Sequence, residues 1–459
     1  LAKIYQNSGK IKESNQEAKD LITRFPESHL FYQAKILILE NNYYLGLYEE
    51  VIIEGSGIKP NQVSNPDYLN YLKGISHVAL KDYNAALKEF NALLTNYPRS
   101  EYVNEVYAAT THVYYLSNLD EKNFELADKL KSRKNELPSD FYYWLLMSAI
   151  RTEKSNLIII HLPILESKNK NQSEEIYYEW ADFYYNKKEY QKAIDLLTDR
   201  RFSSSHLNSM RNKILGDSYF YLEKYTESSK NYDQYIISGD DDNQKKEALF
   251  FSGLSEFNQK KYDQAFKKFN KFRLAYSNDK EYYDLTIVYL LRSLVNQEKY
   301  HDIVQIVNKI APIPSEKESR FYFYYYCAFG FYQNHQLPQA IDYLEKAIEY
   351  SSSDKQTYTV QKMLGDCFFS KKDYEKAIEA YEKAEKINGI ERLEEISFQK
   401  GLTYIKLQDY EKARENFRKI YELYQSENSD EAYYYVGRCF FLEENYSKVL
   451  DHLILFNEK

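Results

Sequence analysis

The residues of this chain that are best suited to chemistry are its histidines and cysteines, and their spacing does not favour a reaction. Eight histidines are scattered singly: His29, His77, His112, His161, His206, His301, His335 and His452. None has a cysteine or carboxylate partner at a helical interval that suits a metal ion or a proton-transfer pair, so we interpret them as packing or surface residues. Cys327, Cys367 and Cys439 lie far apart, and three thiols cannot form a complete disulfide framework.

Short sequence motifs do not indicate an enzyme or a modified protein either. Ser8-Gly9-Lys10 lacks the earlier glycine and the following hydroxyl residue of a phosphate-binding loop, and no HExxH, nucleophile elbow or zinc spacing occurs. Asn171-Gln172-Ser173 is formally a glycosylation site, but the acidic, Lys- and Asn-rich composition looks bacterial, which makes that motif uninformative. The sequence therefore predicts a protein that is not an enzyme and that needs no metal and no cofactor.

Charge and hydropathy narrow the class of partner. The net charge is −8, with basic residues interleaved among acidic ones, so the electrostatic pattern of a nucleic-acid-binding protein is missing. The longest apolar run, 157–165, is too short to span a membrane and contains His161 and Pro163. Only 13 glycines and 9 prolines are present, too few for the turns of an all-β fold of this length, which favours helices.

An internal repeat is the strongest signal in the sequence. Six glycines share a register: Gly74, Gly216, Gly253, Gly365, Gly401 and Gly437. Nine residues after each comes a tyrosine: Tyr83, Tyr225, Tyr262, Tyr374, Tyr410 and Tyr446. Twelve residues after each comes a mostly small residue, and sixteen after each a large one: Phe90, Tyr232, Phe269, Tyr381, Phe417 and Leu453. The same frame starts again at Ala181, Leu291 and Ala328, and looser copies begin near Ala2, Ala34, Ala109 and Ser148. About thirteen units with a mean spacing of about 36 residues result, as expected of helical-hairpin repeats.

Each repeat position has a physical role in a pair of antiparallel helices. A small residue on each helix permits close approach, while tyrosine and phenylalanine fill the wider gaps. Segments such as 186–190 and 370–374 then form the turn, where lysines suit the negative end of the first helix. Asp82, Asp373 and Asp409 stand where a carboxylate can cap the second helix.

This spacing of a small residue, a tyrosine, an alanine and an aromatic residue resembles the tetratricopeptide repeat over essentially the whole chain. The resemblance implies an all-α, right-handed superhelical α-solenoid, and it implies protein partners without choosing among them. The co-chaperones of that family bind a C-terminal carboxylate with Lys and Asn. The corresponding positions here pair Lys213 with Asp217 and Lys362 with Asp366, and the aspartates would repel such a ligand. No asparagine ladder of the sugar-transferase type is present.

The repeat pattern divides the chain into three parts. Residues 1–131 form an N-terminal block, 132–172 a degenerate repeat or joint, and 173–459 a regular C-terminal block. Because Pro163 falls inside an expected helix, we expect a kink or a change of superhelix at the joint. The first unit is in register from Ala2, so we expect the chain to be a fragment, and a signal peptide, a lipid anchor or a preceding domain can lie upstream of it.

Aromatic residues on the first helices suggest where a partner binds. Positions three before and four after the small residue share a face of the first helix, which lines the concave surface of such arrays. The predicted groove residues are Tyr178, Tyr185, Phe220, Phe250, Phe257, Tyr325, Tyr332, Phe369, Phe398, Tyr434 and Phe441. The expected ligand is a helix or an extended peptide. The alternative, that many of these rings only pack between hairpins, stays open, as does an exposed patch at the all-aromatic run 321–326.

The sequence therefore predicts a non-catalytic scaffold that organises a larger complex. The segment Asn96 to Tyr102 resembles the repeat variant of periplasmic and outer-membrane assembly factors, which favours a bacterial periplasm or cell envelope and an outer-membrane assembly, secretion or flagellar-motor machine. The alternative is a cytoplasmic regulator or adaptor whose repeat array senses a peptide or partner protein, with an effector domain upstream of Leu1. The oligomeric state is open.

Overall fold

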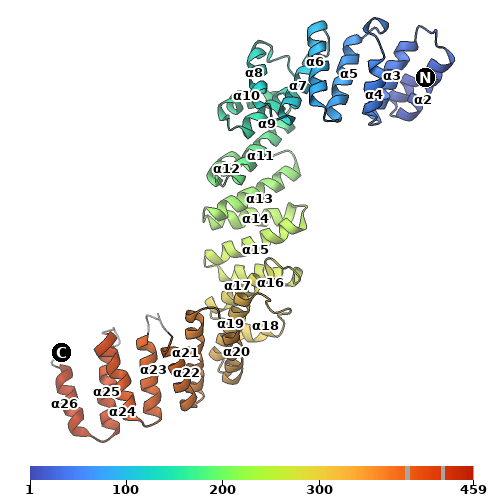
Figure 1. Cartoon of the computed structure of the whole chain (residues 1–459). Coiled ribbons are helices and arrows are strands. Elements are labelled where there is room, and N and C mark those ends of the chain that lie inside the picture. Colours follow the sequence, from blue (N-terminus) through green and yellow to red (C-terminus); the bar gives the residue numbers. More distant parts are fainter. Residues whose placement is uncertain (388–392, 425–428, 458–459) are drawn as a thin grey trace. The chain divides into compact units, whose positions relative to one another are not determined.

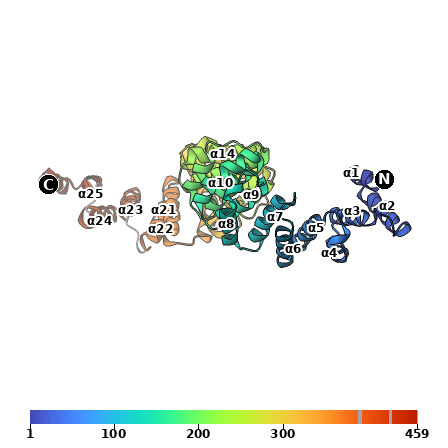
Figure 2. The ribbon, with the colours of Figure 1, turned by 90° about the horizontal axis from the view of Figure 1, so that it is seen from above.

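Helices alone make up the regular structure of the described part of the chain, which comprises residues 1–387, 393–424 and 429–457 in a computed structural model (Figure 1). Its 26 α-helices pair in chain order into thirteen hairpins. In the hairpins α3/α4 and α5/α6, the first helices lie in one layer and the second helices in the other (Figure 2). The prediction of an all-α solenoid of about thirteen hairpins is confirmed for these residues.

Two compact units divide the chain between Ser218 and Tyr219, within α13. The helices that begin in unit 1 are α1 (Ala2–Asn7), α2 (Ile11–Arg24), α3 (Phe31–Tyr44), α4 (Tyr48–Ser56), α5 (Pro66–Ala79), α6 (Tyr83–Asn96), α7 (Val103–Leu116), α8 (Asp120–Lys129), α9 (Ser139–Arg151), α10 (Ser155–Lys168), α11 (Lys170–Asn186), α12 (Tyr190–Leu197) and α13 (Ser205–Tyr221). Those of unit 2 are α14 (Tyr225–Ser238), α15 (Asp242–Asn258), α16 (Tyr262–Ala275), α17 (Tyr283–Asn296), α18 (Tyr300–Val307), α19 (Lys317–Gln333), α20 (Leu337–Glu349), α21 (Asp354–Ser370), α22 (Tyr374–Glu385), α23 (Leu393–Lys406), α24 (Tyr410–Lys419), α25 (Ser429–Leu442) and α26 (Tyr446–Asn457).

The turn inside each hairpin has one geometry throughout the described residues. Seven residues after the small position, the backbone takes the left-handed conformation, with φ between +55° and +76°. In each case the amide of that residue donates to the carbonyl three residues back, and the next amide donates to the carbonyl five back, which is the Schellman motif. The residues concerned are Gly9, Gly46, Lys81, Asn118, Glu153, Lys188, Glu223, Lys260, Glu298, His335, Lys372, Gln408 and Glu444.

The two helices of a hairpin approach most closely at the small position, as the sequence predicts. A Cβ atom added to Gly253 would lie 2.7 Å from Cε1 of Phe269, and one added to Gly401 would lie 2.6 Å from Cζ of Phe417. Both rings are fully buried. The glycine is therefore required because the ring sixteen residues later occupies the space of its side chain.

Three of the loosely predicted repeats were placed in the wrong register. The common turn assigns the small position to Leu39, Thr111 and Leu146, and not to Ala34, Ala109 and Ser148. In the hairpin α3/α4 the small and the large residue of the crossing have exchanged helices. The small residue, Gly55, lies on α4, and the side chain of Leu39 on α3 lies 3.4 Å from where a Cβ of that glycine would be. A search for a small residue on the first helix misses this reversed pair.

The stretch predicted to be degenerate, 132–172, contains a hairpin with the common turn. Helix α10 is continuous through Pro163, and its Ile158 and Leu165 are fully buried. Helix α9 packs against both α7 and α11. The division into blocks at 131 and 172 remains a prediction, because the structure marks a boundary between compact units only at Ser218.

The predicted caps of the second helices are present in two of the three cases. Asp82 accepts a hydrogen bond from the amide of Ala85, and Asp409 accepts one from the amide of Lys412, both at 3.2 Å. Asp373 occupies the same position before α22 but makes no side-chain cap.

The turn geometry yields a first test at Gly46. A Cβ atom there would meet nothing within 4 Å, so Gly46→Ala isolates the cost of the left-handed backbone. We expect it to lower the stability of hairpin α3/α4 by about 1 kcal/mol. Hydrogen exchange of the α3 and α4 amides measures this local stability. Gly57→Ala is the matched control, because Gly57 has φ −79° and ordinary space for a methyl group. Equal losses in both variants would show that left-handed strain is not the cause.

Candidate protein-binding surfaces

The eleven predicted groove residues differ widely in exposure. Phe250 and Phe257 are buried, with 3% and 8% of their surfaces exposed, and they belong to the hydrophobic core of α15 to α22. The prediction that these two line a groove is wrong, because neighbouring hairpins cover both rings. Tyr434 and Phe441 are each 58% exposed. The other seven are half-buried: Tyr178, Tyr185, Phe220, Tyr325, Tyr332, Phe369 and Phe398.

Rings four residues after the small position have a shared structural contact. Six of these rings lie against the tyrosine that opens the second helix of the same hairpin, with ring centroids 5.2 to 6.0 Å apart; Tyr332 has no such partner, because α20 begins with Leu337. The pairs are Tyr43–Tyr48, Tyr185–Tyr190, Phe220–Tyr225, Phe257–Tyr262, Phe369–Tyr374 and Phe441–Tyr446. These rings therefore pack at the hairpin turn, and binding through them remains a prediction.

Several rings three residues before the small position pack against aromatic neighbours. Tyr325 stacks on Phe321 at a centroid distance of 6.0 Å with planes 4° apart. Phe398 lies 5.5 Å from both Phe417 and Tyr435. Part of each of these two rings is therefore already in contact with another aromatic side chain of the array.

The aromatic run 321–326 surrounds α19 with rings, as the sequence indicates. Phe321 and Phe323 are 2% exposed and belong to the core, whereas Tyr322, Tyr325 and Tyr326 are half-buried. Tyr322 stacks on Tyr326 at 5.9 Å. One side of α19 is therefore core, and tyrosines form the surface beside it.

Two hollows flank this tyrosine surface. One, of about 360 Å³, lies between α17 and α19 and is lined by Leu285, Val288, Tyr289, Arg292, Glu316, Glu318, Ser319, Tyr322 and Tyr326. The other, of about 340 Å³, lies between α19 and α21 and is lined by Glu318, Phe321, Tyr322, Tyr325, Ser352, Ser353, Lys355, Gln356 and Thr359. Tyr322 borders both hollows, so they form one surface across three consecutive first helices. We call it the α19 surface.

The charged groups of the α19 surface are partly engaged. Glu316 caps α19 by accepting from the amides of Glu318 and Ser319, at 3.0 and 2.6 Å. The exposed guanidinium of Arg292 lies 5.2 Å from the ring centre of Phe257 and 6.0 Å from that of Tyr289. Rings give the surface its apolar area, and its polar groups are Arg292, Lys355, the two glutamates, an amide and a few hydroxyls.

Most of the α19 surface was missed by sequence reasoning. Of its tyrosines only Tyr325 was among the predicted groove residues; Tyr322 and Tyr326 lie six and two residues before the small position of α19. The available signal was the run 321–326, since six consecutive rings cannot all face one core.

Comparison with protein families supports the repeat assignment. Profiles of the tetratricopeptide repeat match residues 68–100, 215–279 and 398–448. A profile of subunit 3 of the anaphase-promoting complex (cyclosome) matches residues 333–420. The matches fall on hairpins of both units. Over the matched residues the chain is an array of tetratricopeptide repeats.

Solved structures of repeat proteins also align with this tetratricopeptide-repeat array. The crystal structure of the APC/C hetero-tetramer Cut9–Hcn1 aligns at 13% identity and a TM-score of 0.33, over 99% of this chain and 92% of that chain. The C-terminal part of a TPR repeat-containing protein from Cytophaga hutchinsonii aligns at 18% identity and a TM-score of 0.36, over 60% of this chain and 99% of that chain. No curated protein sequence matches the array.

The lysines compared above with the co-chaperone carboxylate site have partners within the repeat array. The ammonium of Lys213 lies 2.6 Å from Oδ2 of Asp217, and both side chains are buried. Asp366 accepts a hydrogen bond from the hydroxyl of Tyr381 at 2.7 Å, and burial raises the pKa of this carboxyl. The aspartates are thus part of the packing between helices.

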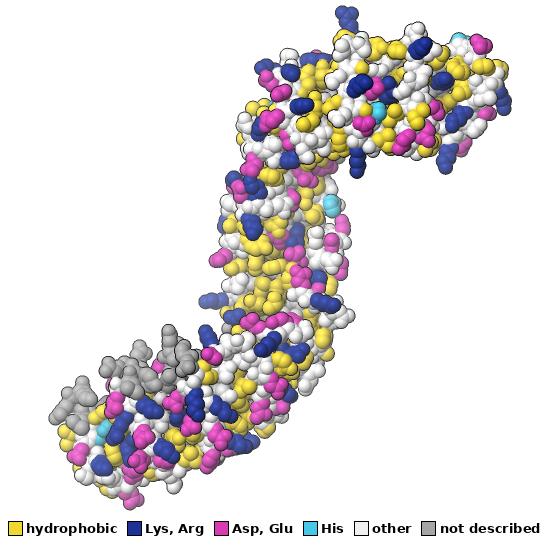
Figure 3. All heavy atoms as spheres, viewed as in Figure 1, with side chains coloured by type: hydrophobic (Ala, Val, Ile, Leu, Met, Phe, Trp, Pro, Cys, Tyr) yellow, Lys and Arg dark blue, Asp and Glu magenta, His cyan; other side chains and the backbone are white. Residues whose placement is uncertain are grey.

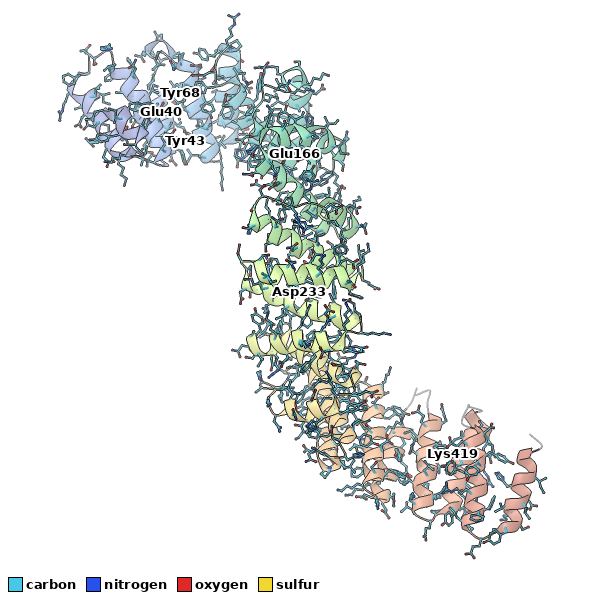
Figure 4. The ribbon with its side chains drawn as sticks, turned by 180° about the vertical axis from the view of Figure 1, so that it is seen from behind. Glu40, Tyr43, Tyr68, Glu166, Asp233 and Lys419 are labelled. Atoms are coloured by element: carbon cyan, nitrogen blue, oxygen red, sulfur yellow. The ribbon has the colours of Figure 1, made fainter. Side chains whose placement is uncertain are left out.

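A partly buried polar seam lies between α14, α15 and α16. The ammonium of Lys268 donates to Oγ of Ser252 at 2.6 Å and to Oδ1 of Asp233 at 2.9 Å (Asp233 is labelled in Figure 4). Oγ of Ser229 lies 2.9 Å from the same ammonium. Because the lysine charge is paired and hydrogen-bonded, we interpret the seam as packing between hairpins.

Thiols and other metal-binding side chains are not arranged as a reactive site in the described part of the array. Burial raises the pKa of Cys367 to about 12 and that of Cys439 to about 11, and it raises the pKa of Cys327 as well. Among the described residues no three His, Cys, Asp or Glu side chains are grouped so that they could hold a metal ion. None of the helices in this part has both the length and the apolar character to cross a membrane.

The burial of Phe257 gives a second test. Phe257→Ser removes a core ring, so we expect the free energy of unfolding of the surrounding hairpins to fall by about 3 kcal/mol. Tyr434→Ser removes a ring that is 58% exposed, and we expect little change. Thermal unfolding followed by circular dichroism measures both. Unchanged stability of the Phe257→Ser variant would restore this ring as a candidate binding residue.

Proposed function

We propose that this chain is a protein-interaction scaffold whose α19 surface binds an extended or helical peptide segment of a partner. The observation that carries the proposal is the pair of hollows that share Tyr322. Each is large enough for one or two side chains, and a segment that crosses α19 can place side chains in both.

The composition of the α19 surface suits protein binding. Tyrosine offers a large contact area with few rotatable bonds, and its hydroxyl can accept or donate a hydrogen bond at the rim. Elsewhere, apolar side chains on the visible faces of both units are interspersed with charged groups of both signs (Figure 3). A lined hollow is therefore a more specific candidate than general surface hydrophobicity.

Arg292 indicates which charged residue the bound segment of the partner contains. Its guanidinium lies on ring faces at the edge of the α17–α19 hollow and forms no ion pair among the described residues. A carboxylate of the partner can bind it directly. We therefore expect a segment with apolar anchors and an acidic residue.

A displayed peptide library tests this function. Selection on the purified chain should enrich peptides with aromatic or aliphatic anchors, and a synthetic copy should bind at least tenfold more weakly to the Tyr322→Ala variant, because such an anchor is worth more than about 1.4 kcal/mol. Tyr44→Ala, at a ring that is 65% exposed in unit 1, is the matched control and should bind as the unchanged chain does. Equal affinity for Tyr322→Ala, or no selective enrichment, contradicts the proposal.

The setting that we propose for this scaffold is a bacterial cell envelope, where it would serve an assembly, secretion or flagellar-motor machine. The support is the segment Asn96 to Tyr102, which joins α6 to α7 and resembles the corresponding segment of periplasmic and outer-membrane assembly factors.

Fractionation of the native cells tests the setting. We expect the complete protein to be released with the periplasm or to sediment with the envelope, and to be degraded by protease once the outer membrane is permeabilised. Recovery with the cytoplasmic fraction and protection from protease would instead favour the cytoplasmic adaptor.

A further inference from the structure

A second surface, in unit 1, combines rings with unbalanced carboxylates. It is formed by α7, α9 and α11 and consists of Tyr115, Tyr143, Trp144, Glu175, Glu179 and Asp182, which we call the acidic-aromatic face. Helix α9 packs against both neighbours, so the six residues lie on adjacent first helices. All lie within the first compact unit, whereas the α19 surface belongs to the second.

The rings of this face form one cluster around Trp144. Its indole stacks on His112 at a centroid distance of 3.9 Å, with planes 11° apart. Tyr143 meets it edge-on at 4.9 Å, and Tyr115 lies 5.3 Å away. Tyr115, Tyr143 and Trp144 are all half-buried, so each presents part of its ring to solvent.

The carboxylates stand next to these rings along one side of α11. Glu175, Glu179 and Asp182 are spaced four and then three residues apart, which places them on one helical face over roughly 10 Å. Glu175 and Glu179 both act on the hydroxyl of Tyr143, whose pKa is raised to about 12 chiefly by burial. The acidic row and the ring cluster are therefore continuous.

The carboxylate row lacks a balancing cation among the described residues. None of the three carboxylates forms an ion pair with a lysine, arginine or histidine in the described structure. The nearest polar support is the amide of Asn186, which donates to Oδ2 of Asp182 at 2.8 Å. Burial, together with Asp182 and Glu175, raises the pKa of Glu179, so a cation beside this carboxylate would stabilise its charged form.

The chain already shows how such a surface holds a cation. At the end of α9, the guanidinium carbon of Arg151 lies 4.3 Å from the ring centre of Tyr115, and its nitrogen lies 2.6 Å from Oδ1 of Asp120. A ring and a carboxylate thus share one arginine, by cation–π attraction and an ion pair. Arg151 thus already occupies the Tyr115 edge of the acidic-aromatic face, whereas Tyr143 and Trp144 lie beside carboxylates of α11 that form no ion pair among the described residues.

We propose that the acidic-aromatic face binds a lysine- or arginine-rich segment of a second protein partner. The carboxylates of the row favour a cationic ligand, which would stabilise their charged form, and the rings add apolar area and cation–π attraction. A single metal ion does not fit, because the carboxylates are strung along α11 and the described residues include no cluster that could hold one. A polypeptide with basic side chains a few residues apart matches that spacing.

Tryptophan fluorescence gives a direct readout, because the chain has only two tryptophans and Trp180 lies on α11. In a Trp180→Phe background, Trp144 reports on the acidic-aromatic face alone. The probe is a twelve-residue peptide of alternating arginine and alanine. Glutamate in place of arginine gives the control peptide. We expect the arginine peptide to change the emission of Trp144 saturably, and the glutamate peptide to leave it unchanged.

Charge variants test whether this row is the determinant. In the double variant Glu179→Gln/Asp182→Asn, which keeps the shape and removes two charges, we expect the arginine peptide to bind about tenfold more weakly. The matched control is Glu49→Gln/Glu50→Gln, which removes two exposed carboxylates of α4 in the same unit and should change affinity less than twofold.

Three results would overturn the proposal. The arginine peptide could leave the emission of Trp144 unchanged, or it could bind the double variant as tightly as the unchanged chain. Its affinity could also fall equally in both charge variants, which would show that only the net charge of the chain matters. Sedimentation of the chain alone is the fourth measurement. A dimer that is lost in Glu179→Gln/Asp182→Asn would identify a second copy as the occupant instead.

Discussion

The contact on which this structure depends is the crossing of two helices at a residue without a large side chain. At Gly253 and Gly401 the ring sixteen residues later occupies the position of the missing Cβ, and this ring is fully buried. The left-handed turn seven residues after the crossing fixes where the second helix starts. The ring sixteen residues after the small position therefore lies directly opposite that position. Crossing and turn together define a hairpin, and each hairpin needs only its neighbours to bury its remaining faces.

The sequence predicts the fold well because this crossing leaves a periodic trace. Where the small residue stands on the first helix, glycine, tyrosine and ring identify the hairpin. The prediction failed for α3/α4, where Leu39 and Gly55 exchange roles, since packing depends on the summed volume across the crossing and not on which helix carries the small residue. The register of the hairpin α9/α10 was predicted wrongly for a related reason. Its small position is occupied by Leu146, so no small side chain marks the crossing.

Binding surfaces are harder to predict than the fold, because a repeat position does not determine exposure. Phe257 and Phe441 occupy equivalent positions, yet the first is core and the second is 58% exposed, since a following hairpin covers only the first in the described structure. The rings of the α19 surface stand in other positions. Their exposure results from an excess of aromatic residues on α19, and the hollows depend on what α17 and α21 leave uncovered. The two proposed surfaces lie in different units and differ in chemistry, as a scaffold for two partners requires.

The uneven distribution of tryptophan and cysteine provides spectroscopic and chemical access to each unit separately. Trp144 and Trp180 both belong to unit 1, while the three thiols are fully buried in unit 2. A buried thiol with a raised pKa reacts with alkylating agents only when its hairpin opens. Indole emission and thiol labelling of the unaltered chain can therefore follow the opening of its two halves independently, without any introduced label.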